Sequence, residues 1–270
     1  MSAKARILYD MDAVAASAVT SSSATSGNPA NSVLHDHPGK IWQASGDVGE
    51  WVQFYSASGL TFNQVALFNH NLSSTATVLL QGSTDANWTI PDDIPFNETI
   101  PLTVDADDNI LPRANMFFAA TSYNYWRVFI NDVNNADGKI RVGRICAGVY
   151  YEVSRNFSDG SRFTLKDPST FSKVPGSVEN ITIKTAADGQ ASRFRQVRVD
   201  FSLTTEAEFE KWEAIFSKIG NSRPCVLSLD PDNEPTKKTA YCYLLTDMDI
   251  VWNLADNFDI VTLVFEEKTR

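Results

Sequence analysis

The alternation of apolar and polar positions divides the chain into two series of short strand-like segments. In the first series, five segments are rich in apolar residues and are bounded by Gly, Asn, Asp or Pro. Segments of this length and spacing predict an antiparallel β-sandwich. The five predicted strands are Trp51–Tyr55, Phe62–Phe68, Ala76–Gln81, Trp126–Ile130 and Ile140–Ala147.

The second series begins near Tyr150 and contains one helix among strands. Apolar residues follow Thr205 at helical spacing and stop at Gly220, so a helix over 205–219 is predicted, opened by a capping box between Thr205 and Glu208. We expect Phe209, Trp212 and Phe216 to anchor this helix on a sheet. Five more strands are predicted, at Asn180–Thr185, Val197–Leu203, Cys225–Leu229, Ala240–Thr246 and Ile260–Phe265.

Two stretches lack either pattern. Residues 15–32 consist almost entirely of Ala, Ser, Thr, Gly, Asn and Pro, which bury too little apolar surface to offset their ordering entropy. Residues 87–115 contain four prolines and an acidic run, and they predict a long loop. The chain is therefore divided into an extended N-terminal arm at 1–30 and two β domains at 31–148 and 149–270.

Composition excludes several classes of function. Hydrophobic residues make up 43% of the 270 residues, enough for two cores, and the formal charge of −10 gives no electrostatic reason to bind nucleic acid. Three widely spaced cysteines without a CxxC pattern predict neither disulfides nor a zinc site, and they favour a reducing compartment. The N-terminus lacks the pattern of a signal peptide, and no apolar run is long enough to cross a membrane.

The sequence offers little for catalysis. The chain has three histidines and no GxSxG, P-loop or GxGxxG motif. His35 and His37 could bind a metal from a strand, but the following Pro38-Gly39 favours a polar turn. The carboxylate pairs Asp230/Asp232 and Asp247/Asp249 could serve a glycosidase or calcium, but turn residues are the favoured interpretation. We therefore predict a non-enzymatic protein without cofactor or metal.

The third histidine lies in Asn69-His70-Asn71, between two strand-like segments. Asparagine and histidine tolerate the backbone conformations of tight reversals, so His70 is predicted to occupy a corner rather than a catalytic site.

Aromatic and basic residues supply the candidate binding sites. Trp51 and Trp126 alternate within strands and are predicted to be core, whereas Trp88 lies in a polar loop and is a candidate glycan contact. The basic cluster Arg193, Arg195 and Arg198 is equally compatible with a solvated face and with a subunit interface. In the second interpretation, we expect these arginines to face the region of Asp230 and Asp232 in a neighbouring copy.

Two parts of the chain resemble known families. The segment NSVLHDHPGKIWQASGDVGEWVQF, with VALFNHNLS, TVLLQGS and YWRVFIND, resembles the discoidin-type, galactose-binding-like sandwich as it occurs in bacteriophage tail proteins. The resemblance implies a jelly roll over 31–148. In lectin members of that family, loop arginines, histidines and aromatics bind sugar, and no such set can be transferred to this chain.

The segment SRFRQVRVDFSLTTEAEFEKWEAIFSKIGNSRPCVLSLDPDNEP resembles the tail-tube and distal-tail domains of tailed bacteriophages. This resemblance implies a ring-forming sandwich with one flanking helix, preferably hexameric, contacting other tail proteins. The protein would then be a structural component of the virion tail tip or baseplate, assembled in the host cytoplasm. The alternative is an adhesin module that recognises a glycan on the host surface. The order of the two domains is the reverse of that common in distal tail proteins.

Overall fold

The computed structural model describes residues 4–86, 88, 94–154, 156–157, 161–167, 170–174, 177–182, 193–253 and 257–268. The chain is mainly β, as predicted, and forms two compact units. The first unit comprises Met1–Val153 and Cys225–Thr239, and the second comprises Ser154–Pro224 and Ala240–Arg270. This division differs from the predicted one in that residues 225–239 return to the first unit.

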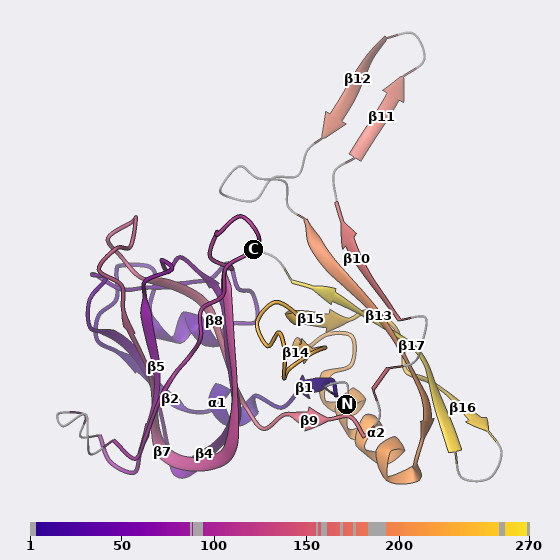
Figure 1. Ribbon diagram of the computed structural model, residues 1–270, viewed down its shortest axis with the longest axis horizontal. Coiled ribbons are helices and arrows are strands. Elements are labelled where there is room, and N and C mark those ends of the chain that lie inside the picture. Colours follow the sequence, from indigo (N-terminus) through magenta and orange to yellow (C-terminus); the bar gives the residue numbers. More distant parts are fainter. Residues whose placement is uncertain are drawn as a thin grey trace. The chain divides into compact units, whose positions relative to one another are not determined.

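The first unit is built on one antiparallel sheet (Figure 1). Its strand order is β3-β8-β4-β7-β5-β6, and β2 pairs with β4 outside that path. The strands are β2 (Ala18–Ser21), β3 (Trp42–Gln43), β4 (Glu50–His70), β5 (Thr77–Ser83), β6 (Phe96–Thr99), β7 (Arg113–Asn131) and β8 (Arg141–Gly148).

The length and curvature of β4 and β7 turn this sheet into two layers. The ladder between them shifts register between Tyr55 and Leu60 and again between Phe62 and Gln64, and such irregularities bend strands. Before the bend, β4 pairs with β2 and with the end of β7; after it, β4 pairs with β8 and with the start of β7. Two of the predicted strands are therefore halves of one bent strand.

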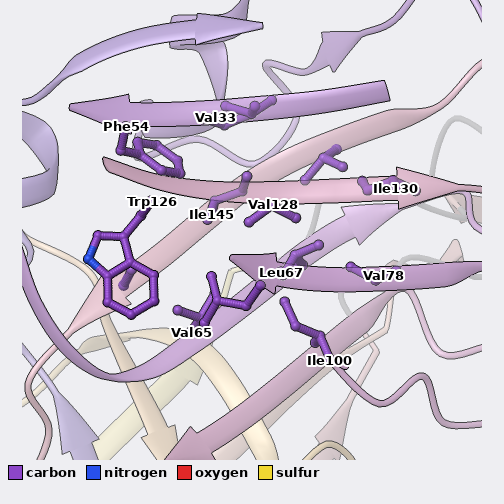
Figure 2. Packing of buried hydrophobic residues seen from close by; sticks show 14 of the residues in the cluster. Val33, Phe54, Val65, Leu67, Val78, Ile100, Trp126, Val128, Ile130 and Ile145 are labelled. Atoms are coloured by element: carbon purple, nitrogen blue, oxygen red, sulfur yellow. The ribbon is translucent and has the colours of Figure 1, made fainter. Parts of the chain in front are cut away.

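The core of the first unit lies between these layers, as Figure 2 shows. Phe54, Trp126 and Val128 come from the first layer, and Val65 and Leu67 come from the second. All five are at most 1% exposed, and burying each such side chain contributes about 1.5–3 kcal/mol. The Trp126 indole N–H donates to the Leu60 carbonyl at 2.8 Å, so its polar atom is also satisfied.

The outer side of the second layer is covered by other parts of the same unit. Strand β1 (Arg6–Leu8) pairs with β9 (Tyr151–Glu152) and with β14 (Cys225–Ser228). Buried Gln64 donates to Asn115, which in turn donates to the Pro235 carbonyl at 3.0 Å. These bonds explain why residues 225–239 belong to the first unit.

The segment predicted as an extended N-terminal arm at 1–30 is held by other residues of the first unit over most of its length. Residues 1–30 contain β1, β2, the short helix α1 (Asp12–Ala15) and the start of the 3-10 helix η1 (Ala30–Leu34). The Glu50 carboxylate accepts hydrogen bonds from Ser22 and Ser23, and the Ser23 carbonyl accepts from the Trp42 indole. A segment with little apolar surface is thus held by backbone pairing and hydroxyl groups.

The second unit combines a sheet with one helix. Its strand order is β10-β13-β17-β15, with β16 paired to β17, and β11 and β12 form a separate hairpin (Figure 1). The strands are β10 (Arg162–Lys166), β11 (Thr170–Val174), β12 (Ser177–Thr182), β13 (Phe194–Thr204), β15 (Thr239–Leu244), β16 (Asp249–Asn253) and β17 (Asn257–Glu267). Residues 183–185 of a predicted strand lie outside the described residues.

Helix α2 (Glu206–Ile219) confirms the predicted helix. Its buried stripe includes Trp212 and Ile215, and it stops at Gly220, whose φ of 47° is left-handed. Thr205 makes no side-chain capping bond; the Glu208 carboxylate instead accepts from the backbone N–H of Ser154 at 2.9 Å, so the capping-box prediction is wrong.

Candidate functional site

A row of polar residues crosses the first layer on the side away from the core. Gln53 of β4 lies directly opposite Arg127 of β7, which lies opposite Gln81 of β5. The row continues to Thr20 of β2 and Asn97 of β6. Residues directly opposite one another share a face, and their sequence neighbours Phe54, Trp126 and Leu80 belong to the core. The row therefore lies on the outer face of this layer.

Aromatic residues flank this row on both sides. On one side of the Gln53–Arg127 pair, Trp51 lies opposite Phe129. On the other side, Tyr55 lies opposite Tyr125. The two tyrosine rings are stacked, with centroids 4.5 Å apart and planes inclined by 29°. Rows two residues apart are separated by about 7 Å, so the three rows span about 14 Å. We call these rows, with Gln81, the outer face.

Arg127 is the charged residue of the outer face, and its side chain is buried. The residue is 8% exposed, and its Nε and Nη2 both donate to Gln81 Oε1, at 2.8 and 2.5 Å. Gln81 in turn donates to Asn97 at 3.0 Å. Burial lowers the pKa of the Arg127 guanidinium to about 10. The guanidinium nevertheless remains charged at neutral pH and is held in a fixed orientation.

Trp88 lies against this arginine. Its ring centroid is 4.3 Å from Arg127 Cζ, and its indole N–H donates to Gln53 Oε1 at 2.7 Å. The residue is half-buried, so it is less exposed than a free loop platform. Its predicted role as a glycan contact stays a prediction, but the structure brings Trp88 together with Gln53, Arg127 and Gln81.

The sequence interpretation missed most of the outer face. Trp51 was predicted to be core, which is wrong, because it lies on the face opposite Val52 and Phe54 and is half-buried. The alternation itself contained the signal, since burying Val52 and Phe54 places Trp51, Gln53 and Tyr55 on the other side. The Arg127–Gln81 pairing has no comparable local signal, because it depends on the register of two separate strands.

The predicted interface arginines occupy different environments in the second unit. Arg193 is exposed and lies 3.7 Å from Asp167, and exposed Arg198 donates to the Thr262 hydroxyl at 2.9 Å. Arg195 is 6% exposed, and its guanidinium contacts the Glu267 carboxylate at 2.5 Å. A role at a subunit interface stays a prediction for all three.

Asp230 and Asp232 lie in the first unit, in the turn around Pro231. Lys238 contacts the Asp230 carboxylate at 2.9 Å, and hydrogen bonds from Lys238 and Asn233 lower the pKa of that carboxyl group. Asp232 lies 3.1 Å from Arg6. Both carboxylates therefore have cationic partners within their own unit, and their contact with a neighbouring copy stays a prediction.

The corner prediction for the Asn69–Asn71 segment is confirmed. Asn69 has a left-handed φ of 57°, and its side-chain amide donates to the Pro38 carbonyl at 2.6 Å. His70 ends β4 at 2% exposure, where its Nδ1 accepts from the Leu72 N–H at 3.4 Å. Asn71 Nδ2 donates to Asp137 at 2.9 Å. His70 is thus a buried part of the reversal.

His35 and His37 lie in the turn predicted for them. The Nδ1 atom of His35 accepts from the His37 backbone N–H, and that of His37 accepts from the Gly39 N–H, each at 3.0 Å. No group of three or more His, Cys, Asp or Glu suited to a metal ion occurs in the described part of the chain. Over the same residues, no helix is long and apolar enough to span a membrane.

A hollow of about 440 Å³ in the first unit contains another arginine. Arg6 lies 4.7 Å from the Phe117 ring centroid and 4.8 Å from that of Tyr150, and it pairs with Glu152 at 2.9 Å and with Asp232. The charge of Arg6 is therefore neutralised by its neighbours, whereas no carboxylate of the described residues pairs with Arg127.

No family model and no curated protein matches the chain. Several solved structures are similar to it. Chitosan-binding module 1 of a chitosanase/glucanase from Paenibacillus sp. IK-5 is 20% identical, with a TM-score of 0.38 over 50% of this chain and 96% of that one. A family 32 carbohydrate-binding module of Clostridium perfringens NanJ, in complex with galactose, is 10% identical, with a TM-score of 0.39 over 54% and 99%.

The lectin-binding domain of lectinolysin, complexed with Lewis b, is 12% identical, with a TM-score of 0.39 over 52% of this chain and 96% of that one.

Proposed function

We propose that the first unit is a non-catalytic carbohydrate-binding module and that it binds saccharide on the outer face. One observation carries the proposal: half-buried aromatic rings lie beside an ordered row of amide and guanidinium groups on a layer whose opposite side is the core. On the outer side of the other layer, β1 and residues 225–239 occupy part of the surface, and the arginine there, Arg6, is already paired with Glu152 and Asp232.

The residue types of the outer face suit a sugar ring. The stacked pair Tyr55–Tyr125 and the half-buried Trp51 offer apolar ring surface, on which the C–H faces of a pyranose can pack. Gln53 is half-buried, and its side-chain amide can donate to a hydroxyl, while Gln81 holds Arg127 in place. Aromatic surface with a few placed polar groups is the usual composition of small-molecule sites.

A glycan array followed by calorimetry on the intact chain tests this proposal. We expect binding to at least one saccharide class, and we expect Tyr55→Ala to weaken it about tenfold, which corresponds to the loss of about 1.4 kcal/mol. Val133→Ala, at a residue that is 65% exposed in the same unit, is the matched control and should bind normally. Absence of binding to any saccharide would contradict the proposal.

A second candidate function is assembly into a homo-oligomeric ring in the tail tip or baseplate of a tailed bacteriophage virion, built in the host cytoplasm with other tail proteins. It is favoured by strand β10, where Phe163 and Leu165 are 55% and 60% exposed. Exposed apolar residues on an edge strand are typical of surfaces that pair with another chain. The residues of β10 that the structure describes pair with β13 alone.

Native mass spectrometry of the purified chain, alone and with the proteins of neighbouring genes, tests this second function. We expect a closed ring, preferably hexameric, that is weakened by Phe163→Ser together with Leu165→Ser. A chain that remains monomeric under all these conditions would contradict it.

A further inference from the structure

Arg127 carries a charge that no described carboxylate neutralises. Among the residues that the structure describes, its hydrogen bonds go to the neutral amide oxygen of Gln81, and its other close neighbours are the Trp88 and Phe129 rings. The protein as a whole has a formal charge of −10, so acidic groups are abundant elsewhere. Within the described part of the chain, the lack of a carboxylate beside this buried cation is therefore a local property.

Two other arginines with little exposed side chain contact a carboxylate. The Arg195 side chain is 7% exposed and contacts Glu267, and the Arg6 side chain is 14% exposed and contacts Glu152. Removing a guanidinium from water is costly unless an anion compensates it, so an arginine without a carboxylate partner stands out. Buried groups with perturbed pKa values that are not part of a structural ion pair are common at binding sites.

The geometry around Arg127 leaves one side of the guanidinium open to a ligand. Nε and Nη2 of Arg127 both donate to Gln81, which fixes the plane of the guanidinium. The Trp88 ring stacks on this guanidinium. Among the residues that the structure describes, the hydrogen bonds of Arg127 engage Nε and Nη2 only, which leaves Nη1 for a ligand. A ligand carboxylate can approach this nitrogen in the plane of the guanidinium, the direction that such groups prefer.

We propose that the saccharide bound by the outer face is acidic, with a uronate-type carboxylate at Arg127. This inference rests on the proposed function, since it names the substrate class of the same site. Trp51 and the Tyr55–Tyr125 pair lie in the rows on either side of Arg127, about 7 Å away, and they would contact the sugar rings that flank the charged one. Gln53, which holds the Trp88 indole, keeps the stacking ring in place.

Calorimetry with matched oligosaccharides tests the inference. The probes are a short oligogalacturonate, its methyl ester and a neutral galactose oligomer of the same length. We expect the acid to bind the intact protein at least tenfold more tightly than either uncharged probe, with a preference that weakens as salt is added. Arg127→Gln should abolish this preference, whereas Arg127→Lys should retain part of it, because lysine keeps the charge without the planar donor pair.

The outcomes separate the two proposals. Equal binding of the acid, the ester and the neutral probe would overturn the inference and leave the carbohydrate-binding function standing. Absence of binding for all three, in a protein that also binds nothing on a glycan array, would overturn both. If Arg127→Gln does not fold, the comparison of acid with methyl ester on the unaltered protein still decides the question.

Discussion

The guanidinium carbon of Arg127 lies 4.3 Å from the centre of the Trp88 ring. Each side chain is also held by a glutamine of a neighbouring strand, Arg127 by Gln81 and Trp88 by Gln53. A loop residue and a strand residue are therefore positioned as one group on the outer face. Because cation–π contacts strengthen when water is excluded, this group is suited to a ligand that covers it.

Replacing Trp88 should weaken ligand binding more than it weakens the fold. We expect Trp88→Ala to lower the affinity for the bound saccharide about tenfold, through loss of the stacked ring and of the bond to Gln53. Trp88→Phe, which keeps a ring but not the N–H, should fall between Ala and the unaltered protein. Calorimetry gives the affinities, and equal affinities for all three proteins would exclude Trp88 from the site.

The left-handed backbone at Asn69 makes this corner sensitive to substitution. Alanine disfavours the positive φ of 57° at this position, and Asn69→Ala also removes the hydrogen bond to the Pro38 carbonyl. We therefore expect Asn69→Ala to lower the free energy of unfolding by about 1–3 kcal/mol. Asn69→Gly removes the bond but accepts the conformation, so it should lose less. Urea denaturation measures both, and a larger loss for Gly would contradict the backbone argument.

The Arg195–Glu267 pair should stabilise the second unit from within. Removing one partner of a buried pair leaves the other charge unpaired, so we expect Arg195→Ala to lower the free energy of unfolding by about 3–5 kcal/mol. Arg198→Ala, at an exposed residue of the same strand, is the matched control and should cost less than about 1 kcal/mol.

If urea denaturation gives the same loss of unfolding free energy for both variants, Arg195 is not buried in the folded protein. Charge reversal at Arg193 and Arg198 is consequently the cleaner test of the predicted interface, since it leaves the buried pair intact.

The thiol of Cys146 should be inert in the folded protein. Burial raises the pKa of this thiol to about 11, and Cys225 and Cys242 are buried as well. At pH 8, only about one Cys146 thiol in a thousand would then be ionised, and that fraction would be shielded from reagents. We expect a thiol-specific dye to label all three cysteines in urea and none in the native protein. Rapid native labelling would contradict the burial.

Local pattern was sufficient to predict much of the fold but not its tertiary pairing. The helix at 205–219 was predicted because its apolar spacing and Gly220 are local signals, and the same holds for the corner at Asn69. The bend that makes β4 one strand was not predictable, because a polar interval such as Ser56–Gly59 is equally typical of a loop.

Local sequence pattern also failed to predict how the N-terminal segment and residues 225–239 join the first unit. The Ser/Thr-rich N-terminal segment becomes ordered through pairing with β4, a strand more than thirty residues later in the chain. Residues 225–239 join the first unit through bonds such as that between Asn115 and Pro235. Contacts between residues far apart in sequence leave no periodic signal at either end, so neither was predicted.

Trp88 is the one residue of the candidate site that was predicted from the sequence. Trp88 was identified because an aromatic residue in a polar loop is unusual, but its partners depend on the register of β4, β5 and β7. Register places Gln53, Arg127 and Gln81 in one row, although none of the three is distinctive in its own segment.

The central claim, that saccharide binds at Trp88 and Arg127, is tested most directly by following the tryptophan indole N–H signals in a nitrogen-15 NMR titration with a short oligogalacturonate. The indoles of Trp42 and Trp126 donate to backbone carbonyls inside the first unit and serve as internal controls. We expect the Trp88 signal to shift with saturation while those two remain unchanged. A Trp88 signal that does not move while other residues respond, or the absence of any response, would contradict the claim.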